Sequence, residues 1–233
     1  MFHSRFLLSR VTQTRKRECS VLRILSTRRR DIQDAAEIVR KGGVVAYPTD
    51  TVYGLACDPH NPRALRRLMS AKGRQKKPLP ILVASPRAAQ RIVVVDRRAN
   101  ELARAFWPGP LTLVLKARVR FPRSLTLGRK TIAIRCPDDR TALRLISRCG
   151  GLLTGTSANL TGQPPCTSAA MVRRFLGDKI DGVVDGGPSR RRVGSTIVRV
   201  DSRGATILRK GPIRKEQVMR AFLGASRRHK NRH

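Results

Sequence analysis

Apolar residues recur with two different periods along this chain, and they predict short strands that alternate with helices. Between Asp31 and Lys41 the apolar positions are three or four residues apart, which is the spacing of one helix face. The uninterrupted apolar run at residues 44–47 comes soon after and predicts a buried strand. Asn61 and Pro62 then form a helix start, because Asn61 can cap the helix and proline suits the first helical position.

The same two patterns continue through the rest of the predicted domain. Strands are expected at residues 79–84, 111–116, 131–135, 152–154, 182–185, 195–200 and 205–209, and helices at 61–72, 96–106, 138–149 and 215–223. Asp96 and Asp138 are the expected helix caps. Since strands and helices are mixed in this order, the sequence predicts an α/β fold: a single domain on a twisted mixed sheet with flanking helices.

The predicted domain occupies residues 27–224, between two basic ends. Residues 1–26 are rich in Arg and Ser and contain one acid, Glu18. This composition fits a disordered basic arm, an organellar transit peptide, or a segment upstream of the true start. Residues 225–233 form a basic C-terminal tail. We expect a cytoplasmic location, or a mitochondrion or other organelle if the N-terminal extension is a transit peptide.

Charge and cysteine content narrow the classes of partner and site. The formal net charge of +35 comes from 50 Lys and Arg against 15 Asp and Glu. This charge indicates a polyanionic partner such as nucleic acid, or, with equal weight, an Arg-rich surface that only contacts solvent. The five cysteines form no C-x-x-C pair, so the sequence argues against a structural zinc site, and their odd number argues against a disulfide framework. No apolar stretch approaches the roughly 20 residues that span a bilayer.

The familiar nucleotide-binding motifs are absent. The chain has no G-x-x-x-x-G-K-[ST] and no G-x-G-x-x-G, and its four histidines leave little scope for acid–base catalysis by imidazole. The segment Gly155 to Asn159 is not a nucleophile elbow, because asparagine replaces the second glycine. The remaining chemistry is a reaction driven by positioning and charge stabilisation, as in phosphoryl or nucleotidyl transfer.

Such chemistry needs cations and small polar groups that converge on one place. The cations at the ends of predicted elements are Lys72, Arg74, Lys77, Arg135 and Arg209, and the small polar candidates are Thr51, Ser157, Asn159 and Ser195. Read singly, each cation is an ordinary surface residue of an Arg-rich chain, and each small polar residue is a turn residue or a helix cap.

The motifs that contain these candidates carry more information than the single residues. In chain order they are Pro48 to Leu55 (P-T-D-T-V-Y-G-L), Lys72-x-Arg74, Trp107 to Thr112, Thr131 to Pro137, Ser157-x-Asn159, Gly194-Ser195-Thr196 and Leu208 to Gly211. By these motifs, over roughly residues 30–223, the chain resembles the YrdC/TsaC family of threonylcarbamoyl-AMP synthases, in its short single-domain form.

The resemblance implies a large positively charged cavity and a nucleotidyltransferase that condenses L-threonine, bicarbonate and ATP to threonylcarbamoyl-AMP and pyrophosphate. By family position, Lys72, Arg74, Ser157 and Asn159 are catalytic; Thr51, Arg135, Gly155 and Ser195 bind L-threonine; Arg74, Lys77, Thr131, Ser157 and Arg209 bind ATP. Mg²⁺ is expected to arrive with ATP, without dedicated protein ligands.

The resemblance also implies partners in tRNA modification. The product serves the threonylcarbamoyl modification of the adenosine next to the anticodon, so tRNA and a threonylcarbamoyl transferase complex are expected partners. Two other functions stay open: a non-catalytic protein that binds double-stranded RNA or tRNA, and carbamoyl-adenylate chemistry of the kind used in hydrogenase maturation. Aromatic residues are 4% of the chain, which counts against single-strand recognition by base stacking.

Overall fold

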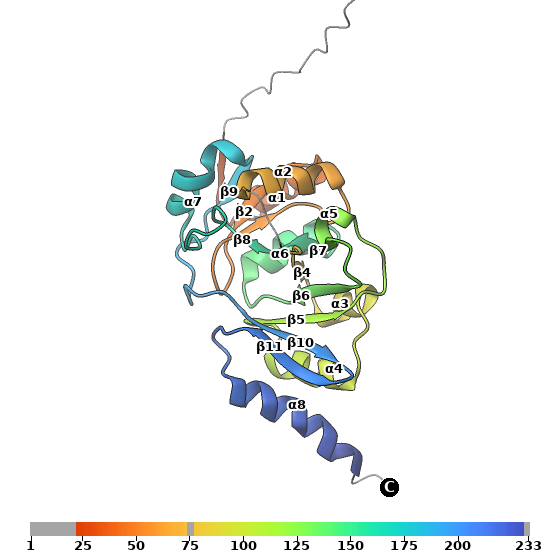
Figure 1. Cartoon of the computed structure of the whole chain (residues 1–233). Helices are drawn as coiled ribbons and strands as arrows, with labels where there is room; N and C mark the ends of the chain where they lie inside the picture. Colours follow the sequence, from red (N-terminus) through yellow and green to blue (C-terminus); the bar gives the residue numbers. More distant parts are fainter. Residues whose placement is uncertain (1–21, 74–76, 231–233) are drawn as a thin grey trace, which may run out of the picture.

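The computed structural model describes residues 22–73 and 77–230, with side chains described up to Gly224, and has the mixed α/β class that the sequence predicts (Figure 1). The helices are α1 (Arg29–Arg40), α2 (Pro62–Lys72), α3 (Pro86–Ile92), α4 (Arg97–Phe106), α5 (Arg123–Thr126), α6 (Arg140–Arg148), α7 (Ala169–Leu176), the 3-10 helix η1 (Gly177–Lys179) and α8 (Lys215–Lys230). The strands are β1 (Arg23–Leu25), β2 (Val45–Tyr47), β3 (Gly54–Ala56), β4 (Ile81–Val83), β5 (Leu111–Lys116), β6 (Thr131–Arg135), β7 (Leu152–Thr154), β8 (Thr156–Ser157), β9 (Gly182–Val184), β10 (Thr196–Asp201) and β11 (Gly204–Arg209).

The strands form two mixed sheets, where the sequence led us to expect one. The first sheet has the order β1-β9-β2-β3-β8, and the second has the order β11-β10-β5-β6-β4-β7. In Figure 1 the first sheet lies in the upper half with α1, α2 and α7, while α4 and α8 lie at the lower end beside β10 and β11. The strand periodicity identifies each strand but not its partners, so the division into two sheets could not be read from it.

A single glycine separates a strand of one sheet from a strand of the other. Thr154 ends β7 in the second sheet, Thr156 begins β8 in the first, and Gly155 lies between them. The Gly155 N–H donates to the carbonyl of Pro80 (2.9 Å), which holds the crossover against β4. A Cβ at this position would lie 2.4 Å from Cγ of Leu82, so the close packing accepts only glycine.

The predicted elements are confirmed with differences at their ends, and the structure adds elements that the sequence did not predict, among them α3, α5, α7, β3 and β8. Helix α1 begins two residues before Asp31, whose Oδ2 accepts from the Ser26 N–H (2.7 Å) in place of capping the helix itself. The cap of α6 is Asp139, one residue after the predicted Asp138, and its side chain accepts from the Ala142 N–H. The caps at Asn61 and Asp96 are confirmed.

Ordered structure extends past both predicted domain boundaries. Strand β1 lies in the segment that we assigned to the N-terminal extension, and it pairs in parallel with β9. Helix α8 continues to Lys230, beyond the predicted end at Leu223. The pattern missed β1 because a three-residue strand with two exposed positions offers little periodicity. None of the helices in the described ranges combines the length and apolar character that a membrane crossing requires.

We expect Gly155→Ala to destabilise the protein by roughly 1–3 kcal/mol, because the new methyl group overpacks against Leu82. Chemical denaturation measures the change. Gly224→Ala is the matched control, since a Cβ there meets nothing within 4 Å and alanine favours a helix. A Gly155→Ala protein as stable as this control would contradict the account of the crossover.

Candidate functional site

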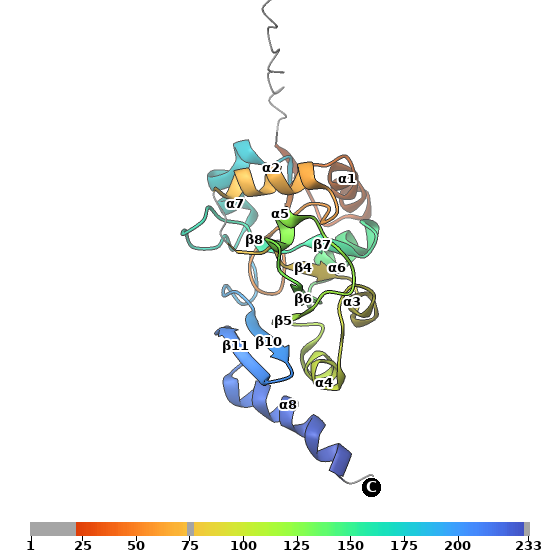
Figure 2. The ribbon, with the colours of Figure 1, turned by 45° about the vertical axis from the view of Figure 1, so that its right-hand side comes forward.

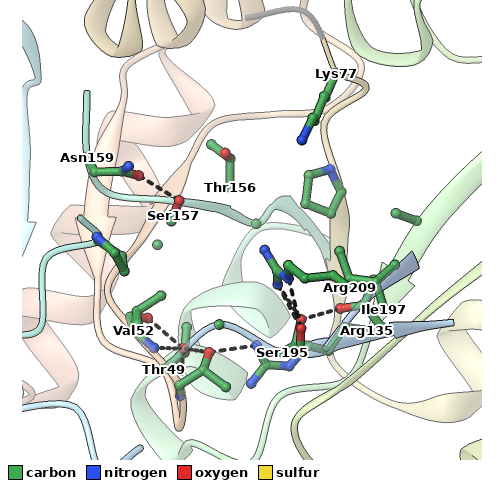
Figure 3. Close-up of a pocket in the computed structure, with 18 of the residues that line it drawn as sticks. Thr49, Val52, Lys77, Arg135, Thr156, Ser157, Asn159, Ser195, Ile197 and Arg209 are labelled. Carbon is green, nitrogen blue, oxygen red and sulfur yellow. Dashed lines mark hydrogen bonds between the residues drawn. The ribbon is translucent and has the colours of Figure 1, made fainter. Parts of the chain in front are cut away.

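A cavity of about 680 Å³ is lined by both sheets and contains most of the predicted site residues. Gly54 and Ser157 line it from the first sheet, and Thr112, Arg135 and Arg209 from the second. Figure 3 shows Ser157 and Asn159 on one wall, with Arg209 and Ser195 facing them from the other. The cavity therefore collects side chains from segments that are far apart in the sequence.

The guanidinium of Arg135 is held in place on three sides. It donates to the carboxylate of Asp50 through Nη2, to Oγ1 of Thr51 through Nη1 (2.8 Å), and to the carbonyl of Gly109 through Nε (2.9 Å). Asp50 and Arg135 are only 1% and 5% exposed. Burial lowers the pKa of Arg135, while the charge of the Asp50 carboxylate opposes this shift. One N–H on each terminal nitrogen remains for a ligand.

The turn that carries Asp50 is itself tied by a network of hydroxyl groups. Oγ1 of Thr49 lies 2.9 Å from Oγ1 of Thr51 and donates to the carbonyl of Val52 (2.7 Å). The backbone N–H groups of Thr51 and Val52 donate back to Oγ1 of Thr49. Thr49 and Thr51 are both buried, and both line the cavity. The turn therefore presents the hydroxyl of Thr51 beside Arg135 in a fixed orientation.

Ser195 and Arg209 form a second polar group, on the wall that faces Ser157 and Asn159 (Figure 3). Arg209 donates to the carbonyl of Ser195 through Nε (3.0 Å) and Nη2 (2.8 Å), and Nη2 lies 3.1 Å from Oγ of the same residue. Oγ of Ser195 is also 2.7 Å from Oγ1 of the buried Thr112. Burial lowers the pKa of Arg209, and the nearby charge of Arg135 adds to this shift. A Cβ at Gly194 would lie 3.0 Å from the Arg209 guanidinium, so glycine leaves room for it.

Lys72, at the end of α2, fixes the loop that carries Ser157 and Asn159. Its ammonium donates to the carbonyl of Ser157, to the carbonyl of Asn159 (3.0 Å) and to Oδ1 of Asn159 (3.1 Å). These three acceptors match the three protons of an ammonium. Oγ of Ser157 also donates to Oδ1 of Asn159 (2.6 Å). Burial lowers the pKa of Lys72 to about 8, so the charge is retained at neutral pH.

The structure brings together nearly all the predicted site residues that it describes. Thr51, Lys72, Lys77, Arg135, Gly155, Ser157, Asn159, Ser195 and Arg209 line the cavity. Thr131 does not line it, because it stands at the far end of β6 from Arg135. Arg74 lies outside the described residues. The motifs also contain Thr49, Thr112 and Lys210, which line the cavity, and Asp50, which holds Arg135 from outside the lining; the sequence analysis singled out none of these four.

The charges at the cavity do not balance. Asp50 neutralises Arg135, but in the described ranges no ion pair joins Lys72 or Arg209 to a carboxylate. Residues 22–73 and 77–224 also contain no group of three His, Cys, Asp or Glu side chains that could hold a metal ion. The arrangement is suited to anionic ligands, because the buried Lys72 and the more exposed Arg209 line the same cavity without an acidic partner in the described ranges.

Residues 37–211 match the family model Sua5/YciO/YrdC, which is described as "Telomere recombination". The chain is 43% identical over 157 residues to a threonylcarbamoyl-AMP synthase of Halorhodospira halophila, covering 66% of this chain and 82% of that one. It is 40% identical over 198 residues to the protein of the same name from Bacillus subtilis, covering 83% of this chain and 57% of that one.

The fold is also similar to that of a solved structure. The crystal structure of Pyrococcus abyssi Sua5 complexed with L-threonine superposes with a TM-score of 0.81 at 36% identity, covering 86% of this chain and 60% of that chain. The chain thus spans little more than half of two of these relatives and four fifths of the third.

Asp50→Asn should destabilise the protein by about 3–5 kcal/mol, because it leaves the buried Arg135 without a counter-charge. The free energy of unfolding in urea gives the change. Asp34→Asn is the matched control: it breaks the exposed pair with Arg23, which contributes about 1 kcal/mol or less. Equal small losses in both variants would show that the Asp50 and Arg135 pair does not organise the turn.

Lys72 should titrate with a midpoint near pH 8, well below the ordinary lysine range, because its ammonium is buried. Side-chain NMR of lysines labelled with ¹³C at Cε follows the titration, and Lys72→Met identifies the signal by its loss. A Lys72 signal that titrates together with the exposed lysines would mean that the ammonium is hydrated and does not clamp the loop.

Proposed function

The chain belongs to the Sua5/YciO/YrdC family, and from this premise we propose that it is a threonylcarbamoyl-AMP synthase. The reaction joins L-threonine, bicarbonate and ATP, and it yields threonylcarbamoyl-AMP, pyrophosphate and water. The observation that carries the proposal is the cavity: the buried Lys72 and the more exposed Arg209, neither with an acidic partner in the described ranges, line it together with small polar groups, which suits a triphosphate beside an amino acid. Relatives that bear this enzyme's name support it.

The threonine end lies at Thr51, Arg135 and Ser195. Arg135 offers one free N–H on each terminal nitrogen, and this pair matches the two oxygens of a carboxylate. The fixed hydroxyl groups of Thr51 and Ser195 can accept from an ammonium or bond to the substrate hydroxyl. Because Asp50 and Gly109 already hold the guanidinium, little side-chain freedom is lost when threonine binds.

The nucleotide end lies at Lys77, Ser157 and Arg209. Lys77 points into the space that Arg209 also faces (Figure 3). A cation in this position offsets the charge that develops as pyrophosphate leaves the α-phosphorus. Lys72 acts beside them by holding Ser157 and Asn159, so it is a positioning residue as well as a source of positive potential. Arg74 belongs to the same site by family position.

Mg²⁺ enters this proposal with ATP. No Asp or Glu is among the described residues that line the cavity, so phosphate oxygens and water are the ligands that a hard cation would find there. Mg²⁺ then neutralises part of the triphosphate charge, while the side chains of this chain bind and orient the substrates.

The product fits a place in tRNA modification, with tRNA and a threonylcarbamoyl transferase complex as partners and the reducing cytoplasm as the site of action. The four described cysteines are free, as expected in that compartment. The sequence also left open an RNA-binding protein without catalysis and a carbamoyl-adenylate enzyme. A cavity of this volume with buried cations favours an enzyme over a protein that only binds RNA. Dependence on threonine separates the synthase from a carbamoyl-adenylate enzyme.

Pyrophosphate release from ATP should require both L-threonine and bicarbonate. The purified full chain is incubated with ATP and Mg²⁺, and each of the two other substrates is omitted in turn. The product made from ¹³C-bicarbonate should be one mass unit heavier than the product made from ordinary bicarbonate. Pyrophosphate release without threonine would point to carbamoyl-adenylate chemistry or to simple ATP hydrolysis. If no pyrophosphate is released with all three substrates present, the proposed function is wrong.

A pair of matched serine variants ties this reaction to the cavity. Ser157→Ala should lower kcat/KM by tenfold or more, since it removes the hydroxyl that bonds to Asn159 on the cavity wall. Ser147→Ala removes an exposed hydroxyl that donates to the carbonyl of Leu143 within α6, and it should leave the rate unchanged. Equal rates for the two variants would place the chemistry elsewhere.

A further inference from the structure

Three arginines surround a small cavity between α1 and α6, in a part of the molecule that the proposed reaction does not use. The cavity has a volume of about 250 Å³ and is lined by Arg29, Ile32, Arg144 and Arg148. In Figures 1 and 2 the two helices lie side by side, and their packing against each other buries part of the hydrophobic core. None of these four residues lines the threonine and nucleotide cavity.

The positive charge of this cluster is not compensated. In the described ranges no carboxylate forms an ion pair with Arg29, Arg144 or Arg148. Arg148 is held instead by a neutral acceptor, because its Nη1 donates to Oε1 of Gln33 (2.9 Å). A neutral acceptor orients the guanidinium without cancelling its charge.

Repulsion between neighbouring arginines also destabilises α6, and a bound anion would reduce this repulsion. Arg140, Arg144 and Arg148 follow one another at four-residue spacing, so they form a single row along α6. Like charges at this spacing destabilise a helix by about 0.2–0.5 kcal/mol per pair. An acidic residue in the row would offset this cost, and the helix has none.

The row begins beside one further cavity. Arg140, at the start of α6, and Arg190 line this cavity of about 590 Å³. Arg190 begins the basic loop Arg190 to Arg192, and this loop runs into Val193 and Gly194, which line the main cavity. Charges of both signs line this intermediate cavity, because Asp138 and Asp139 also line it and Asp138 pairs with Arg190 (3.6 Å), so the uncompensated charge is that of the cluster on α1 and α6.

We propose that the Arg29, Arg144 and Arg148 cluster binds a phosphate group of an RNA backbone. The planar guanidinium group matches the spacing of phosphate oxygens. Several guanidinium groups around one cavity suit a single phosphate group, because its oxygens can accept hydrogen bonds from more than one of them. The described lining has no aromatic side chain for base stacking, so recognition here would depend on charge and shape rather than on sequence. The inference rests on the proposed function in tRNA modification, because it names a surface for the RNA partner.

Salt-dependent binding of unmodified tRNA tests the proposal. Arg144→Ser combined with Arg148→Ser should weaken binding about tenfold at moderate salt, and it should lower the slope of log K against log salt by roughly 1, as expected when one phosphate contact is lost. Arg87→Ser combined with Arg91→Ser is the matched control. These two arginines are also exposed and four residues apart, on α3, but line none of the three cavities.

The outcomes separate this inference from its alternatives. Equal loss of tRNA binding in both double variants would mean diffuse attraction by net charge, and no loss in either would mean that the cluster does not touch RNA; each result overturns the proposal. Titration with inorganic phosphate is the second arm: phosphate binding lost in Arg144→Ser with Arg148→Ser, while tRNA binding is unchanged, would assign the cluster to a free phosphate and also overturn it.

Pyrophosphate release distinguishes this inference from the proposed reaction. Both double variants should release pyrophosphate at the rate of the unaltered chain, because the cluster lies outside the substrate cavity. If the protein makes the adenylate but binds no tRNA, the proposed RNA site is wrong and the proposed reaction stands. If the protein binds tRNA through the cluster but makes no adenylate, the proposed reaction is wrong and the proposed phosphate site is still supported.

Discussion

The buried ion pair between Asp50 and Arg135 joins the two sheets on which this protein is built. Asp50 stands on the turn between β2 and β3 in the first sheet, and Arg135 ends β6 in the second. An ion pair without solvent needs good geometry, since desolvation of both charges costs several kcal/mol. The Asp138 N–H donates to Asp50, and Arg135 donates to Oγ1 of Thr51 and to the carbonyl of Gly109, which fixes both side chains. Of this pair, Arg135 lines the cavity between the sheets.

The same pair decides which charges the cavity offers to a ligand. Asp50 cancels one positive charge and orients it, while Lys72 and Arg209 keep theirs, because in the described part of the chain neither has an acidic partner. One end of the cavity therefore presents an oriented fork and fixed hydroxyl groups, and the rest presents net positive potential. An amino acid and a triphosphate are the pair of ligands that this division suits.

Much of this could be predicted from the sequence, and the failures have physical causes. Strands β5 and β6 and the caps of α2 and α4 follow from local patterns, because periodicity and N-cap chemistry depend on neighbouring residues. The two-sheet architecture depends on which strands pair, and that is decided by contacts such as those between Gly155 and Leu82, 73 positions apart in the chain. The motifs supply most of the residues that line the cavity, but Asp50 escaped notice because its burial and its ion pair exist only in the folded chain.

The central claim is that the cavity has an amino-acid end at Arg135 and a triphosphate end at Lys77, Ser157 and Arg209. A crystal structure of the full chain with L-threonine and a non-hydrolysable ATP analogue tests it most directly. The account predicts the threonine carboxylate on the two free N–H groups of Arg135, with the triphosphate between Arg209 and the loop that Lys72 holds. Triphosphate oxygens bound to Arg135, or threonine bound outside the cavity, would contradict it.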